Sequence, residues 1–73
     1  MLHYTDHARD RMRERGITKE EVEYCLENFV SRYPCENDDD HWNYVYHTPD
    51  NRRIRVVVNE KRQTHKIIIS VMD

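Results

Sequence analysis

Residues 53–59 read Arg-Ile-Arg-Val-Val-Val-Asn, and apolar side chains recur at every second position. Ile54, Val56 and Val58 fall on one side of such a segment, and the two arginines fall on the other. A period of two predicts a β-strand that buries one face and leaves the opposite face uncovered. We therefore expect residues 53–60 to form the middle strand of a half-covered sheet.

The segments on either side of this strand continue the same pattern. Residues 41–48 are rich in aromatic side chains, and residues 65–72 alternate around three isoleucines, as strands do. Residues 49–52, Pro-Asp-Asn-Arg, have the composition of a tight turn. These features predict three antiparallel strands over about 41–48, 53–60 and 65–72. The sequence leaves open whether three aromatic residues face the core or the uncovered face: Trp42, Tyr44 and Tyr46.

The first part of the chain has the period of helices instead. A first helix is expected over about 5–15, because Gly16, the one glycine of the chain, stands where a helix needs a left-handed residue. Thr18 and Glu21 have the spacing of a capping box, and an apolar stripe follows them. They predict a second helix over about 19–30.

These elements predict one α+β domain over residues 1–73. In it, two N-terminal helices pack on one face of a three-stranded antiparallel sheet, and the other face stays open. The residues that we expect to be buried together are Val22, Leu26, Phe29, Ile54, Val56, Val58, Ile67 and Ile69.

The composition restricts the classes of protein that the chain can belong to. Its 73 residues suffice for one small domain, and the longest fully apolar run of three residues is too short to span a membrane. The first residues lack an apolar signal segment, so we expect a cytoplasmic protein. Cys25 and Cys35 are then expected to be reduced.

The charge is unevenly distributed, although its net value is only −2. Residues 18–40 are strongly acidic, whereas residues 1–17 and 41–73 carry an excess of lysine and arginine. A polyanion could dock on the basic segments while the acidic segment faces away. The alternative is that these are ordinary solvated charges of a small protein.

Two groups of basic residues are the candidates for a functional site. His7, Arg11 and Arg15 recur every four residues, so they line one stripe of the first helix beside its buried face. Arg53 and Arg55 project from the open face of the sheet. Arginine can stabilise the charge of a phosphorane and histidine can move protons, which is the chemistry of metal-free RNA cleavage.

We therefore assign roles to six residues. The predicted catalytic residues are His7, Arg11 and Arg55, and the predicted nucleic-acid-binding residues are Arg15, Arg53 and Lys66. No metal or other cofactor is expected, because His3 and His7 have the spacing of a ligand pair but no obvious third ligand. The competing interpretation is that His7 only supports the helix and that the arginines solvate an edge.

Nearly the whole chain resembles a known family. Residues 7–18, His-Ala-x-x-Arg-Met-x-x-Arg-Gly-Ile-Thr, are followed by Glu-Glu-Val at 20–22 and by the strand at 53–58. This pattern resembles DUF4258, a family of small bacterial and phage-associated proteins. That family is similar to the RelE, ParE and BrnT toxins, so the resemblance implies two helices on a curved antiparallel sheet.

The resemblance also implies a choice of functions. Proteins of the wider fold include ribosome-dependent mRNA endonucleases, free ribonucleases and gyrase inhibitors. His7, Arg11 and Arg15 match the helical motif of DUF4258, and Arg53 and Arg55 match basic positions of its middle strand. Two departures weigh against a working toxin, because the chain is slightly acidic and lacks a Tyr, His or Lys close to its C-terminal end.

Two functions remain in view. The first is a toxin-like domain of a bacterial or phage toxin–antitoxin type system that engages RNA as a metal-free ribonuclease, with an antitoxin protein as its cognate partner. The alternative is a non-catalytic binding module of the same fold that uses the open face for a protein partner. Salt-dependent RNA binding would separate them.

Overall fold

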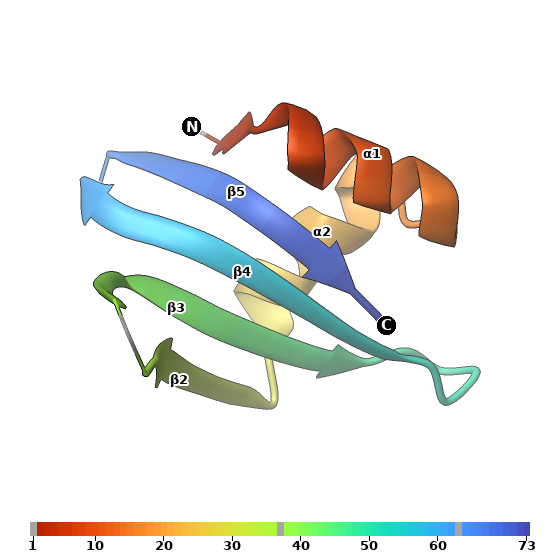
Figure 1. The fold of residues 1–73 in the computed structure, drawn as a ribbon. Helices are drawn as coiled ribbons and strands as arrows, with labels where there is room; N and C mark the ends of the chain where they lie inside the picture. The colour runs from red at the N-terminus through yellow and green to blue at the C-terminus, as the bar shows by residue number, and fades with distance from the viewer. Residues whose placement is uncertain (1, 37, 63) are drawn as a thin grey trace.

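A computed structural model describes residues 2–36, 38–62 and 64–73 of the protein. Within these residues, the chain forms two helices and a five-stranded mixed sheet (Figure 1). One strand precedes the helices in the chain, and the other four follow them. The elements in chain order are β1 (Leu2–Tyr4), α1 (Asp6–Arg15), α2 (Lys19–Asn28), β2 (Ser31–Cys35), β3 (Asp38–His47), β4 (Arg53–Arg62) and β5 (His65–Met72).

The two helices form where the sequence predicts them, because their ends carry the expected capping groups. The Thr5 hydroxyl accepts a hydrogen bond from the Ala8 amide at the start of α1, and Gly16 ends α1 with φ of 65°. At the start of α2, Thr18 and Glu21 form the complete capping box. Each helix begins and ends within two residues of its expected bounds.

The sheet corrects the predicted fold class. The α+β class is right, but the three-stranded antiparallel sheet is wrong, because the strand order is β1-β5-β4-β3-β2 and β1 pairs with β5 in parallel. A strand of three residues is too short to show a period in sequence. Proline has no amide hydrogen to donate, so Pro34 argues against a strand over residues 31–35, but proline is tolerated in an edge strand such as β2.

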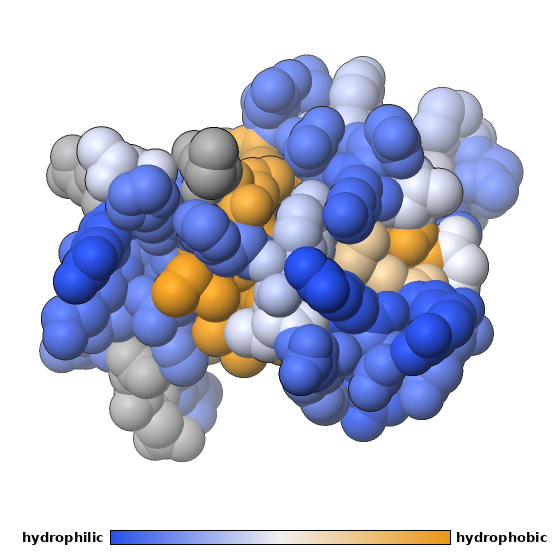
Figure 2. Space-filling model, turned by 90° about the horizontal axis from the view of Figure 1, so that it is seen from above, coloured by the Kyte–Doolittle hydropathy of each residue, from blue (hydrophilic) through white to orange (hydrophobic). Residues whose placement is uncertain are grey.

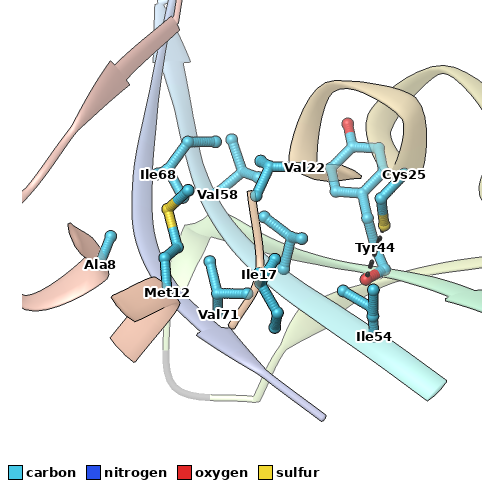
Figure 3. Close-up of a cluster of buried hydrophobic side chains, with 11 residues drawn as sticks. Ala8, Met12, Ile17, Val22, Cys25, Tyr44, Ile54, Val58, Ile68 and Val71 are labelled. Atoms are coloured by element: carbon cyan, nitrogen blue, oxygen red, sulfur yellow. Dashed lines mark hydrogen bonds between the residues drawn. The ribbon is translucent and has the colours of Figure 1, made fainter. Parts of the chain in front are cut away.

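Both helices cover the same face of the sheet. α1 packs along β5, and α2 packs across β3 and β4. Figure 3 shows the core between the layers, where Met12 of α1 and Val22 of α2 meet the strand side chains Val58 and Ile68. The Cys25 thiol lies in this core 3.7 Å from the carbonyl oxygen of Tyr44, and burial raises the pKa of this thiol to about 11.

Half of the predicted core is right, and a bulge in β5 explains two of the four residues that are not, Ile67 and Ile69. Val57 pairs with Ser70 but Val58 pairs with Ile68, so β5 carries one extra residue, Ile69, at this point. A bulge reverses the alternation of faces, so Ile68 and Val71 point into the core and Ile67 does not.

The second helix also differs from the predicted core at its end. Leu26 is only partly buried, and Phe29 is 42% exposed because α2 ends at Asn28. The three aromatic residues of β3 face the helices: Trp42, Tyr44 and Tyr46.

The part of the surface that Figure 2 shows is mostly hydrophilic. Seen from above, hydrophobic residues come to the surface in only a few places between charged and polar ones (Figure 2). Among the described residues, no helix combines the length and hydropathy that crossing a membrane requires.

Candidate functional site

The side of the sheet opposite the helices, here called the open face, gathers most of the histidines. Opposed residues of neighbouring strands point to the same side, and one such row joins His41, Asn59, Ile67 and His3 across four strands. Further residues of this face follow by alternation along each strand: Tyr33, Asn43, His47, Arg53, Arg55 and Val57. His65 joins them, since its ring lies beside that of His3. Four of the five histidines of the chain, all five of which the structure describes, are therefore on the open face.

The two predicted arginines of β4 lie on this face as expected. Arg53 is exposed and opposes His47. Arg55 is half-buried, and its Nη2 lies 2.8 Å from the sulfur of Met72 on β5. The Nε atom of Arg55 is buried and has no hydrogen-bond partner among the described residues. The Arg55 side chain is thus held in place while part of its hydrogen-bonding capacity is unused.

A hollow of about 580 Å³ lies beside Arg55 on the open face. Tyr33 and Pro34 of β2 form one of its sides, and Asn43 and Val57 lie on the neighbouring strands. Tyr33 is 38% exposed, and the Asn43 amide donates to the sulfur of Cys35 at 3.2 Å. An aromatic ring, an amide and a guanidinium group therefore converge on one hollow.

A second pocket, of about 510 Å³, lies at the end of the sheet where β4 turns into β5. Its lining includes His3 of β1, Asn59 of β4 and His65 of β5. The ring centroids of His3 and His65 are 5.5 Å apart. Sequence reasoning missed this pair, because the three residues of β1 are too few to predict a strand, and the spacing of His3 relates it only to His7.

The three predicted residues of α1 do not share a site with Arg55. His7 is exposed, and Arg11 forms an ion pair with Glu14 on the same helix at 3.2 Å. Arg15 forms an ion pair with Asp73 at 2.9 Å. Arg11 and Arg15 therefore have carboxylate partners, and both pairs belong to the surface of the domain.

Lys66 lies on the helix side of the sheet rather than on the open face. Its ammonium group is 3.4 Å from Glu60, and the same carboxylate binds Arg32 at 2.5 Å and accepts a hydrogen bond from the hydroxyl of Tyr44. The Arg32 guanidinium also lies 3.8 Å from the centroid of the Trp42 ring. Lys66 is therefore part of a structural ion cluster around Glu60.

The pKa of Glu60 reflects this cluster. Burial alone would raise the pKa of the carboxyl group, but hydrogen bonds from Tyr44 and Arg32 and the charges of Arg32 and Lys66 outweigh burial and lower it. The pKa of Tyr44 is raised, first by burial and then by its hydrogen bond to Glu60. Tyr44 accordingly stays protonated as the donor, and Glu60 stays charged as the acceptor.

The described part of the chain has no evident cluster of metal ligands. No three His, Cys, Asp or Glu side chains within it lie together as ligands would. The expectation that the domain works without a metal stays a prediction.

Fold and site together define an α+β domain with an uncovered sheet face rich in histidine and arginine. The family model described as "Domain of unknown function (DUF4258)" matches residues 4–73, so the chain belongs to this family. No curated protein and no solved structure matches the chain significantly. The likeness to the RelE, ParE and BrnT toxins stays a hypothesis.

Proposed function

We propose that this domain binds single-stranded RNA on its open face, as the toxin-like member of a toxin–antitoxin type system. The observation that carries the proposal is the composition of this face, which holds four histidines and two strand arginines and is covered by neither of the two described helices. Cationic side chains bind phosphates, and an uncovered face leaves room for unstacked bases. The resemblance to the RelE, ParE and BrnT toxins supports the toxin part of the proposal.

The geometry near Arg55 fits a nucleotide. Arg53 and Arg55 are two residues apart on one strand, so both reach the same stretch of a phosphate backbone. The exposed ring of Tyr33 can stack on a base, and the hollow beside it is large enough to receive one. The contact of Arg55 with Met72 reduces the conformational entropy that this arginine loses on binding.

The charge distribution favours binding on this side of the sheet. The acidic residues Glu20, Glu23 and Glu27 belong to α2, which packs on the other face. Asp39 and Asp40 lie in the first residues of β3, next to the β2–β3 turn. An RNA strand on the open face therefore avoids the acidic helix, and the carboxylates that it approaches include Glu36, which lines the hollow beside Arg55.

The proposal is tested by measuring the affinity for a fluorescent single-stranded RNA of mixed sequence. Arg53→Gln with Arg55→Gln should weaken binding about tenfold or more, because each lost phosphate contact costs charge-assisted hydrogen bonds. The matched control is Arg9→Gln with Arg13→Gln, which removes the same charge from exposed positions on α1. Equal affinities of the two double variants, or no binding by the unmodified domain, would overturn the proposal.

Binding of a protein partner is the second candidate function. It is favoured by the large hydrophobic side chains exposed where α2 leads into β2, which are Tyr24 (51%), Phe29 (42%) and Val30 (63%). This patch is separate from the arginines of the open face, so a protein could bind there without touching them. A partner that protects Phe29 and Val30 from solvent, together with a lack of RNA binding, would favour this candidate.

A further inference from the structure

The pocket between β1 and the β4–β5 turn brings together two histidine side chains, which can transfer protons, a property that RNA binding alone does not need. His3 and His65 lie side by side in it, with ring centroids 5.5 Å apart and planes tilted by 55°. Both side chains are exposed, so a ligand can reach both rings. Lys61 and Arg62 line the same pocket and supply positive charge.

Two irregular features of the fold build this pocket. The parallel pairing of β1 with β5 sets His3 opposite Ile67, two residues from His65. Hydrogen bonds from Thr5 to the carbonyl oxygens of Ile68 and Ile69 hold the end of β1 in this register.

The second feature is an irregularity in β4. Asn59 pairs with Ile67 and Arg62 pairs with His65, so β4 has one residue more than β5 between these pairs. Such a bulge redirects side chains, and consecutive residues, Lys61 and Arg62, both line the pocket as a result.

We infer that this pocket is the site where bound RNA is cleaved, with His3 and His65 as the two proton-transfer groups. The inference rests on the proposed RNA binding. The 2′-oxygen of a ribose attacks the adjacent phosphorus, and one imidazole accepts the proton of the 2′-hydroxyl as the P–O2′ bond forms. The P–O5′ bond breaks, and the other imidazole, in its protonated form, gives its proton to the leaving O5′. The products are a 2′,3′-cyclic phosphate and a 5′-hydroxyl.

The remaining residues of the pocket fit this reaction. In-line attack requires one proton-transfer group at the 2′-oxygen and one at the leaving O5′ of a single phosphate, and the rings of His3 and His65 lie close enough together for both to reach one phosphate. Lys61 and Arg62 can stabilise the charge that develops on the phosphorane oxygens. The Asn59 side chain is already engaged, since its Oδ1 accepts from the amide of Lys61 at 2.9 Å, and it acts as a positioning residue.

The experiment follows cleavage of a single-stranded RNA oligonucleotide of mixed sequence by the full chain under single-turnover conditions, with EDTA present. His3→Ala and His65→Ala should each lower the rate about 100-fold or more, the range typical of a lost general acid or base. Each change should lower the affinity for a 2′-O-methyl oligonucleotide of the same sequence, which binds but cannot be cleaved, far less than it lowers the cleavage rate. His7→Ala is the matched control, since His7 is exposed on α1 and does not line the pocket.

The outcomes separate this inference from the proposed function. Binding of the 2′-O-methyl oligonucleotide without cleavage of RNA, or unchanged rates in the His3 and His65 variants, would overturn the inference and leave RNA binding intact. Failure to bind either oligonucleotide would overturn the proposed function itself. The double variant His3→Ala with His65→Ala, purified in the same way, measures any cleavage by a contaminating nuclease.

Discussion

At the scale of single residues, Glu60 organises the helix side of the sheet. Its carboxylate binds Arg32, Lys66 and the hydroxyl of Tyr44, which come from β2, β5 and β3. The side chain of Glu60 is only 12% exposed, so these contacts are shielded from solvent far more than an ordinary surface ion pair. Lys66 therefore stabilises the fold, although its charge alone made it a plausible ligand for nucleic acid.

This cluster predicts a specific loss of stability in acid. The folded-state pKa of Glu60 is lowered, so its contribution is fully present above the unfolded-state pKa and is lost as pH falls through the folded-state pKa. Glu60→Gln should lower the free energy of unfolding at neutral pH, and the difference from the unmodified protein should shrink as the pH falls from neutral into acid, below the ordinary titration range of a glutamate. Urea unfolding across this range measures the effect, with Glu27→Gln on the exposed side of α2 as the control. A difference between the Glu60 variant and the unmodified protein that persists in acid would contradict the role of the charge.

At the scale of elements, the bulge at Ile69 decides which isoleucines of β5 are buried. Ile68 is completely buried in the core, whereas Ile67 is opposed to His3 and Asn59 on the open face. Ile68→Ala should cost about 2–5 kcal/mol of stability, and Ile67→Ala should cost about 1 kcal/mol or less. Chemical unfolding of the two variants measures both values. Equal costs, or a larger cost at Ile67, would mean that β5 lacks the bulge.

The same strand shows how much of the fold the sequence predicts. The helices were predictable, because Gly16 and the Thr18–Glu21 pair act locally, and the alternation along β4 placed Arg53 and Arg55 correctly. The bulge in β5 was not predictable, because Ile67, Ile68 and Ile69 are equally apolar and the register depends on pairing with β4.

The candidate site was predictable only where it lies on a regular strand. The arginines of β4 could be found by alternation, but the pairing of His3 with His65 depends on a three-residue strand from the other end of the chain. The expected cluster of His7 with Arg55 failed for a related reason. A helical stripe indicates which residues are neighbours on α1, but it does not indicate which strand they will meet.

At the scale of the whole molecule, the two layers of the domain differ in charge. α2 carries most of the glutamates of its segment on one side of the sheet, and Arg53, Arg55 and four histidines occupy the other side. Although the net charge of the chain is −2, a polyanion can therefore approach the open face. This arrangement reconciles the acidic composition with the proposed binding of RNA.

The layered charge predicts how RNA binding responds to salt. Each phosphate contact with single-stranded nucleic acid releases condensed counterions and contributes about 0.7 to the slope of log affinity against log salt concentration. Arg53→Gln with Arg55→Gln should therefore reduce this slope by about 1.4 if each arginine holds one phosphate. The control pair, Arg9→Gln with Arg13→Gln, changes the net charge equally but lies on α1, so its slope should match that of the unmodified domain. Fluorescence anisotropy titrations at several salt concentrations measure all three slopes, and equal reductions in both double variants would show that net charge, rather than contact on the open face, governs binding.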